Sequence, residues 1–449
     1  MLFKVNSKTG VFFAFFAIGG FLAAKGRGKQ KKRRLLQVVF KSLDSLFYLH
    51  FFIVLFSGAV YHEESCLNLE TWKSSIPTKT EIKRMKKLTK YTPIYLGVAL
   101  AAVLSACCCN PQQTAPNCGV IVATNFVAND GKTDVSDALQ KLVDDNPNRT
   151  IYFPDGTYLL STSLKTPADP KKSVSLKLSN FAILKAADTW SESEAVVRLG
   201  AIHPANNINL CGSLYGIDGG IIDCSGKANG VSVDGGRETF VRNLSIKNAK
   251  IGVHIKRGAN GGSSDADVRD VNATGSNSAD SIGLLVEGYD NTFTNMRMAS
   301  FHTGVMLKSQ GNSLRNIHPL YIFVKGGKER DMAHYESSIG FFDQKGGNWH
   351  DFSYSDQFAT GFKLANQSTL SNCFVYWYYG DVKFQTAIES MGKLECIVNN
   401  LRVGFRGKTA KKTILVAEQG GHGVIQNLIG NAPRDYAAAK YYLKGVMIP

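Results

Sequence analysis

Two short stretches that lie 21 residues apart decide the fold: Ile282-Gly283-Leu284-Leu285-Val286 and Thr303-Gly304-Val305-Met306-Leu307. Each has an apolar or Thr residue, then Gly, then three residues whose side chains alternate between the two sides of a strand. Three further copies occupy residues 251–255, 339–343 and 360–364. About three short strands and three turns fit in 21 residues, which is too few for a propeller blade, and the helical spacing of helix-pair repeats is missing. The repeat predicts an all-β fold, a single-stranded right-handed parallel β-helix (solenoid).

A second repeat predicts one turn of each coil. An Asn or Asp followed by an apolar residue recurs at Asn243, Asp270, Asn295, Asn316, Asp351, Asn372, Asn400 and Asn427. Side-chain amides can satisfy backbone groups that a bend leaves open, so we expect these side chains to stack as a ladder. Asp351 takes a ladder position in this interpretation and is therefore structural.

The front of the repeat region has a different pattern. Asp134 or Ser136 can cap a helix that runs to Val143, and two short strands flank the turn Pro154-Asp155-Gly156. Because the open end of a solenoid must be covered, we interpret residues 118–165 as an N-terminal cap with a capping helix. Residues 166–430 are then the coils, and residues 431–449 a C-terminal tail or cap.

Several of these motifs together resemble the pectate-lyase superfamily of β-helix proteins. The resemblance rests on Asn125-Phe126, the run Asp130-Gly131-Lys132-Thr133-Asp134, the following helix, and residues 151–158, which read IYFPDGTY. The turn at residues 216–220 is similar to the next recurrent turn of that superfamily. The resemblance implies a pectin-lyase-like fold and either cleavage or binding of a polysaccharide. Fold-level similarity does not choose between them.

The net charge of +16 lies mainly at the start of the chain. Residues 1–106 carry +12 of it, and the remaining residues carry +4, which is ordinary for a folded body. Nucleic-acid binding is therefore not expected. Only 20% of the residues are charged and 44% are hydrophobic, which excludes a wholly disordered chain.

Residues 85–106 have the order of a secretory signal: a basic start, an apolar stretch, and then Leu104-Ser105-Ala106 before Cys107. This resembles the lipobox of bacterial lipoproteins, which implies lipidation of Cys107, a linker at residues 107–117, and a membrane of the bacterial cell envelope as partner and location. A short hydrophobic helix with incidental cysteines is the alternative. Residues 1–84 form a doubtful extension, interpreted as a start-site misassignment before Met85 or else as a membrane-embedded N-terminus.

The nine cysteines predict no zinc site, because the body of the chain lacks C-x-x-C pairs. Two disulfide pairings are compatible with the sequence, Cys211 with Cys224 and Cys373 with Cys396. Buried free thiols are the alternative.

The sequence leaves three functions open: polysaccharide lyase, glycoside hydrolase, and non-catalytic glycan-binding or adhesive surface protein. Hydrolysis needs a protonated and an ionised carboxyl group on either side of the scissile bond. Elimination on an acidic, pectin-like glycan needs a base and a cation that neutralises the uronate. The polygalacturonase motifs are not reproduced in order, and Gly421-His422-Gly423 is interpreted as a turn. No dense acidic calcium cluster is present in the sequence, so no cofactor is assigned and Ca²⁺ stays open.

The candidate site lies where the repeat length breaks. Between Asn316 and Gly340 the chain is longer than at other junctions, and about 15 extra residues within 319–338 predict a loop that leaves the solenoid. Asp343 follows at an inward strand position, with an outward bulge as the alternative, and a buried carboxylate must find partners or change its pKa. The predicted catalytic residues are Asp343, His350, Tyr354 and Asp356, and the predicted substrate-binding residues are Lys325, Arg330, His334 and Trp349. Lys256, Glu287 and Lys308 are interpreted as a surface charge ladder.

Overall fold

The computed structural model describes residues 119–202, 215–257, 263–276, 278–322, 324–325, 328–329, 332–378, 385–405, 412–418 and 421–430. The predicted extension, signal, lipidated Cys107 and linker lie outside the described residues, as does the tail after residue 430. Cys211 and Arg330 also lie outside them.

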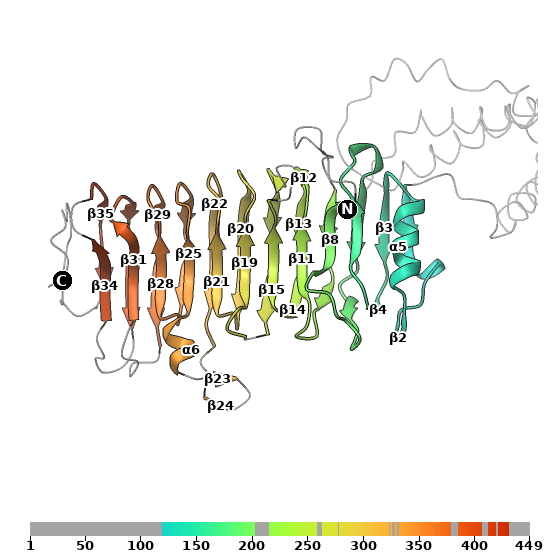
Figure 1. Cartoon of the computed structure of the whole chain (residues 1–449), viewed down its shortest axis with the longest axis horizontal. Coiled ribbons are helices and arrows are strands. Elements are labelled where there is room, and N and C mark those ends of the chain that lie inside the picture. The colour runs from blue at the N-terminus through green and yellow to red at the C-terminus, as the bar shows by residue number, and fades with distance from the viewer. Residues whose placement is uncertain are drawn as a thin grey trace, which may run out of the picture. The chain divides into compact units, whose positions relative to one another are not determined.

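The described residues form a parallel β-helix, which confirms the predicted fold class (Figure 1). Each coil contributes strands to two sheets, and almost every strand pairs in parallel with the strand one coil away. The ten-stranded sheet has the order β34-β31-β28-β25-β21-β19-β15-β11-β8-β5 and contains the Gly repeat. The larger sheet has 22 strands and bends at the Asn repeat, so its strands form two further sides of the coil.

The strands of the ten-stranded sheet are β5 (Leu164–Pro167), β8 (Ala195–Ile202), β11 (Asn229–Val233), β15 (Ile251–Ile255), β19 (Ile282–Val286), β21 (Thr303–Leu307), β25 (Ile339–Asp343), β28 (Thr360–Leu364), β31 (Gln385–Lys393) and β34 (Lys412–Glu418). Those of the 22-stranded sheet are β1 (Val120–Val122), β2 (Asp130–Asp134), β3 (Arg149–Phe153), β4 (Gly156–Leu160), β6 (Val174–Leu178), β7 (Ala182–Ala186), β9 (Gly216–Asp218), β10 (Ile221–Asp223), β13 (Phe240–Arg242), β14 (Ser245–Ala249), β17 (Asp267–Arg269), β18 (Asn272–Gly275), β20 (Thr292–Ala299), β22 (Ser313–Leu320), β26 (Trp349–Asp351), β27 (Tyr354–Asp356), β29 (Thr369–Ser371), β30 (Phe374–Trp377), β32 (Ile397–Asn399), β33 (Arg402–Phe405), β35 (Val424–Gln426) and β36 (Ile429–Gly430). Two small pairs, β12 (Gly236–Arg237) with β16 (Ser263–Ser264) and β23 (Val324–Lys325) with β24 (Lys328–Glu329), complete the strands.

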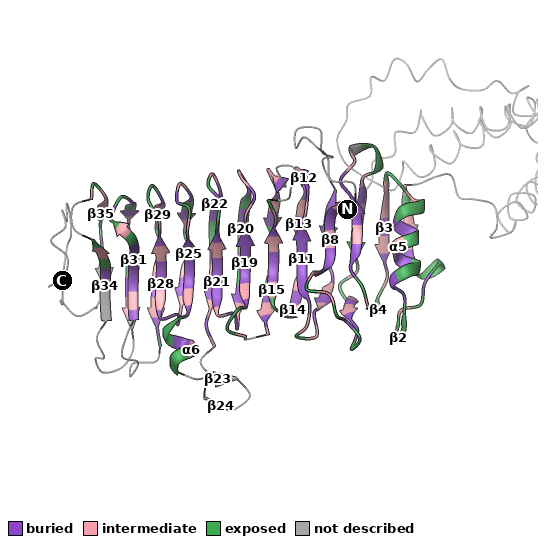
Figure 2. Ribbon diagram, in the orientation of Figure 1, coloured by how far each residue is buried: buried purple, intermediate pink, exposed green. Residues whose placement is uncertain are grey.

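The core consists of inward side chains stacked in register from coil to coil. Leu284, Val305, Phe341 and Phe362 are successive partners on four strands, and all four are fully buried. The rings of Phe341 and Phe362 stack with centroids 4.6 Å apart. Buried and partly exposed positions alternate along the strands (Figure 2), as the sequence alternation predicts.

The repeat glycines are required by close approach at one corner of the coil. A Cβ on Gly304 would lie 2.3 Å from the Pro319 ring and 2.5 Å from the carbonyl oxygen of Gly340. Neither the proline ring nor the backbone can move away cheaply. The Gly in each copy of the repeat therefore leaves space for a side chain that points inward from the 22-stranded sheet of the same coil, such as Pro319 beside Gly304.

The predicted Asn ladder is present, with one correction. Ladder residues have a left-handed backbone, with φ between 49° and 56°, and their amides join neighbouring coils, as in the 2.9 Å bonds that Asn427 donates to Asn400 and Asn400 donates to Asn372. Asp351 pairs in register with Arg315 and Ser371, so it lies one position before the ladder. The ladder position of that coil is Phe352, and Asp351 instead accepts a bond from the Asn372 amide at 3.2 Å.

The elements predicted at the two irregular places are present. Helix α5 (Ser136–Asp145) buries Leu139, Leu142 and Val143, and Asp134 accepts a bond from the Ser136 backbone N–H at 3.0 Å. Between β22 and β25, the extra residues include β23, β24 and the short helix α6 (Met332–Glu336), which project from the coils in Figure 1. Two 3-10 turns, η2 (Ala123–Asn125) and η3 (Pro170–Lys172), complete the described elements.

Three described cysteines, Cys224, Cys373 and Cys396, are buried free thiols. The open alternative of a disulfide between Cys373 and Cys396 is thereby excluded in this structure. The two α-helices of the described part are too short and too polar to cross a bilayer.

Candidate functional site

Two of the predicted catalytic residues meet inside the coil instead of on its surface. Asp343 is the register partner of Leu307 and Leu364, so it is inward as predicted and not turned out by a bulge. His350 is the register partner of Leu314 and Leu370 on a different side of the coil. Its Nε2 lies 3.5 Å from Asp343 Oδ2, and neither side chain has exposed surface. A polysaccharide cannot contact either residue in this structure.

Asp343 has found the partners that a buried carboxylate needs. It accepts hydrogen bonds from the Gly346 backbone N–H at 2.8 Å, the Asn348 amide at 2.9 Å and the Ser368 hydroxyl at 2.6 Å. Burial alone would raise the pKa of Asp343, but these bonds and the neighbouring His350 outweigh it and lower the pKa. Asp343 is thus an ionised structural residue that ties the turn at residues 346–348 to Ser368 of the next coil.

Tyr354 and Asp356 do lie together, on the outer side of β27. The imidazole ring of His318, one coil earlier, stacks on Tyr354 at 4.2 Å, and its Nε2 lies 3.5 Å from Asp356 Oδ2. Burial and then the hydrogen bond to Asp356 raise the pKa of Tyr354. His318 was not among the predicted residues, because only its register beside Tyr354 identifies it.

The remaining predicted residues are dispersed. Trp349 lies on the outer side of β26 and is 53% exposed. His334 on α6 accepts or donates a 2.8 Å bond with the Tyr321 hydroxyl, so it helps to hold the insertion on the coils. The side chains of Lys325 and Arg330 lie outside the described residues. The structure therefore does not bring all eight predicted residues into one site.

A second group of titratable residues lies on the outer face of the ten-stranded sheet and is better connected. We call it the charge cluster, and it comprises Glu194, Arg198, Asp234, His254, Lys256 and Glu287. On β15, Val253 and Ile255 point into the core, so His254 points outward by the period of two. Arg198, Ser232 and His254 are register partners on β8, β11 and β15. Neighbouring strands are about 4.8 Å apart, which spaces the Arg198 and His254 backbones by roughly 10 Å.

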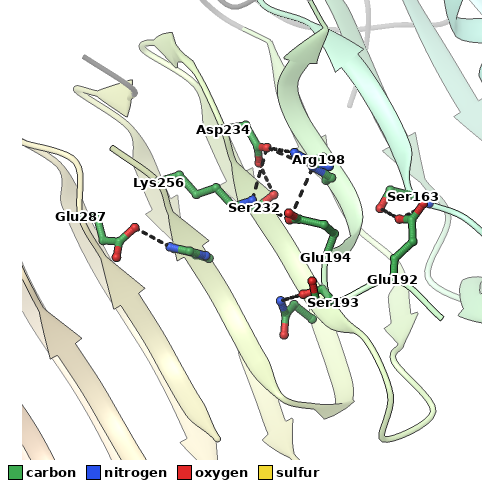
Figure 3. A network of polar contacts seen from close by, with 11 residues as sticks. Ser163, Glu192, Ser193, Glu194, Arg198, Ser232, Asp234, Lys256 and Glu287 are labelled. Carbon is green, nitrogen blue, oxygen red and sulfur yellow. Dashed lines mark hydrogen bonds and ion pairs between the residues drawn. The ribbon is translucent and has the colours of Figure 1, made fainter. Parts of the chain in front are cut away.

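Lys256 joins the carboxylates of this cluster (Figure 3). Its Nζ lies 2.5 Å from Glu194 Oε2 and 3.5 Å from Asp234 Oδ2, so those two oxygens are within about 6 Å of each other. Arg198 donates to Asp234 from both Nε, at 3.0 Å, and Nη2, at 2.5 Å. The Asp234 side chain is only 10% exposed and that of Lys256 21%, so these charges are partly screened from water.

Two cations of the cluster retain hydrogen-bonding capacity. A lysine ammonium has three donors and an arginine guanidinium five. Lys256 uses two of its donors on Glu194 and Asp234, and the Nη1 edge of Arg198 makes no hydrogen bond with any residue that the structure describes. These unused donors are the groups of the cluster that can still accept a further hydrogen-bonding partner.

His254 and Glu287 form the other half of the cluster. His254 Nε2 lies 3.1 Å from Glu287 Oε2, and Lys308 lies 3.1 Å from Oε1. The hydrogen bond from His254, together with Lys308, lowers the pKa of Glu287 to about 2 against the opposing effect of burial. An ionised Glu287 favours a proton on Nε2 and leaves the lone pair of the imidazole on Nδ1.

The sequence contained a partial signal for this cluster. Lys256, Glu287 and Lys308 each lie four residues after a repeat Gly, and the predicted ladder between Glu287 and Lys308 is present. Lys256 departs from it, because it pairs with Glu194, directly before β8, and with Asp234, directly after β11, which lie 62 and 22 residues earlier. Their approach depends on the coil register, which the sequence spacing did not give.

The donor set of the cluster restricts its chemistry. Every carboxylate in it contacts a lysine, Glu194 and Asp234 through Lys256 and Glu287 through Lys308. The described part of the chain holds no group of three or more His, Cys, Asp or Glu side chains that could bind a metal ion. The cluster does combine an imidazole with two partly buried cations.

Comparisons with known proteins agree with the fold. Residues 122–325, fewer than half of the chain, match the family described as rhamnogalacturonase A/epimerase, pectate-lyase-like. No curated protein matches the sequence.

Several solved structures are similar at low identity. The ORF18 protein of Geobacillus virus E2 is 13% identical with a TM-score of 0.47, over 68% of this chain and 60% of that chain. An alginate lyase from Paenibacillus sp. str. FPU-7 is 14% identical with a TM-score of 0.41, over 65% and 96% of the two chains. The tailspike protein gp49 from Acinetobacter baumannii bacteriophage Fri1, a capsular polysaccharide depolymerase, is 12% identical with a TM-score of 0.44, over 70% and 59%. The match thus spans about 60% of the length of the viral proteins.

Proposed function

We propose that this chain is a polysaccharide lyase that cleaves acidic glycans by β-elimination at the charge cluster. The observation that carries the proposal is the placement of Arg198 and Lys256 beside the His254–Glu287 pair on the outer side of the ten-stranded sheet. The family match over residues 122–325 supports a polysaccharide as the substrate class.

The residues have distinct roles in this reaction. Lys256 and the free edge of Arg198 bind the uronate carboxylate, and this stabilises the negative charge that develops when the adjacent C–H bond is broken. His254 takes that proton on Nδ1, since histidine exchanges protons most readily near neutral pH. The electron pair of the C–H bond forms the C=C bond, and the glycosidic oxygen leaves with its own bonding pair and takes a proton from solvent. Glu287 holds the imidazole in the required tautomer and is a positioning residue.

A glycan panel tests the proposal with a matched pair of variants. Cleavage is followed by the ultraviolet absorbance of the unsaturated uronate and, separately, by new reducing ends. Lys256→Gln should lower turnover by about 10²-fold or more, because it removes one charge that faces the carboxylate. Lys363→Gln is the control, since Lys363 lies on the outer face of the same sheet and pairs with Glu389 at 2.7 Å, outside the cluster. Equal activity of the two variants would refute the site, and reducing ends without absorbance would show hydrolysis instead.

The same proposal includes a cell-envelope location, because the sequence before residue 118 resembles a lipoprotein signal ending at Cys107. Lipidation would hold the β-helix at a bacterial membrane where it meets polymeric substrate. Expression of the full chain in a bacterium and separation of membranes tests this part. A Cys107→Ser variant should move to the soluble fraction, and its retention with the membranes would contradict the anchor.

A further inference from the structure

Phe352 occupies a backbone position that suits its side chain poorly. It has φ of 49° at the corner where the neighbouring coils place Asn316 and Asn372, at 54° and 56°. Asn tolerates this left-handed conformation because its short polar side chain bonds locally, whereas a bulky residue is strained there. The aromatic ring also interrupts the amide ladder, since Asn372 donates to Asp351 instead.

The ring of Phe352 does not contribute to the core in return. It is 53% exposed, the same fraction as Trp349 three residues earlier in the same coil. Trp349 has the small residues Ser313 and Thr369 as its register partners, so no large side chain flanks it along the sheet. Two large aromatic surfaces thus face solvent, one on strand β26 and one at the bend that follows it, and the second is maintained against a backbone preference.

Arg315 adds a charge to this corner. Its guanidinium carbon lies 5.5 Å from the centre of the Phe352 ring, and its side chain is 65% exposed. The nearest carboxylate oxygen, on Asp351, is 3.9 Å from Arg315 Nε, too far for a hydrogen bond. The guanidinium remains able to bind a carboxylate from outside.

We infer that Trp349, Phe352 and Arg315 form a second glycan-binding site, separate from the charge cluster, on which the rings of an acidic polysaccharide stack. The apolar faces of pyranose rings pack on the aromatic surfaces, and Arg315 binds a uronate carboxylate. The folded chain would be more stable with Asn at position 352, so stability does not explain why Phe is there. Glycan binding does explain it, because the exposed ring at this strained position then serves function. The inference rests on the proposed function for its class of ligand, an acidic polysaccharide. The position of the second site does not depend on where the polysaccharide is cleaved.

The substitution Phe352→Asn tests this directly, because it restores the residue that the ladder favours. In the full chain we expect the thermal midpoint to rise, while affinity for long acidic polysaccharides, measured by affinity electrophoresis, falls about three- to tenfold. Trp349→Ala should weaken binding to a similar extent. Phe181→Asn is the control, since Phe181 is also exposed but lies at the bend between β6 and β7, several coils before Phe352.

The outcomes separate this inference from the proposed function. Unchanged affinity in Phe352→Asn, with Lys256→Gln inactive, would overturn the second site and leave the lyase proposal standing. Weakened binding in Phe352→Asn, with Lys256→Gln fully active, would support the second site and refute the charge cluster as the catalytic site. If the Phe352→Asn variant loses self-association in sedimentation but keeps its glycan affinity, the corner is a contact between copies of the chain, and the inference is overturned. Absence of binding to every acidic glycan tested would overturn it as well.

Discussion

Replacing Asp343 by Leu should destabilise the β-helix strongly even though Leu fits the space. Leu occupies the register positions on both sides, at 307 and 364, so the substitution preserves the shape of the stack. It removes the acceptor for the N–H of Gly346, the amide of Asn348 and the hydroxyl of Ser368, and it takes away the carboxylate that lies 3.5 Å from His350 Nε2. Each buried donor without an acceptor costs about 1–3 kcal/mol. Because three donors lose this acceptor, we expect a total loss of at least about 3 kcal/mol.

The loss should also depend on pH with a defined sign. The folded pKa of Asp343 is lowered relative to an unfolded value of about 3.9. The stabilisation from its ionised form is therefore complete above that unfolded value and is lost as pH falls through the lower folded pKa. The stability difference between wild type and Asp343→Leu should be largest at neutral pH and should shrink below about pH 4.

Urea unfolding monitored by circular dichroism measures both effects. The double variant Asp343→Leu/His350→Leu is the informative control, since Leu also occupies the neighbours of His350, at 314 and 370. Removing both partners should recover more than about 1 kcal/mol of the loss, because no polar imidazole is then left buried among apolar side chains. A loss below about 1 kcal/mol for Asp343→Leu, equal at pH 3 and pH 7, would refute the structural role assigned to this carboxylate.

Two further predictions concern the core and the ladder. Asn400→Ala should lower the unfolding free energy by about 1–2 kcal/mol, because Asn400 donates to Asn372, accepts from Asn427 and has φ of 55°. Urea unfolding measures this loss, and an unchanged transition would contradict the ladder. Cys373 and Cys396 should resist iodoacetamide in the folded protein and react after unfolding, since burial raises their pKa to about 12 and about 11; rapid labelling of the native chain would show that the coil is open there.

The sequence predicted the architecture well because its repeat has a direct physical cause. Gly304 is fixed by the approach of Pro319 and a carbonyl oxygen, and the ladder residues by their left-handed backbone. Such local requirements recur in every coil and are visible in one sequence. The inward position of Asp343 followed from the same alternation.

The site was harder to predict because it depends on register between distant coils. His350 was predicted to be catalytic, but its register with Leu314 places it on an inward position, where it meets Asp343. The ladder was placed one residue early in this coil because Asp351 resembles a ladder residue and Phe352 does not. The contacts of Lys256 with Glu194 and Asp234 span 62 and 22 residues, and no local pattern encodes them.

The most direct test of the lyase proposal is the structure of the new chain end in the cleavage products. Wild-type protein is incubated with an acidic polysaccharide that it binds, and the oligosaccharides are analysed by mass spectrometry and NMR, with Lys256→Gln and Lys363→Gln alongside. We predict a C=C bond in the terminal sugar of every product from wild type and from Lys363→Gln, and almost no product from Lys256→Gln. Products with water added across the broken bond, or cleavage that persists in Lys256→Gln, would contradict the proposal.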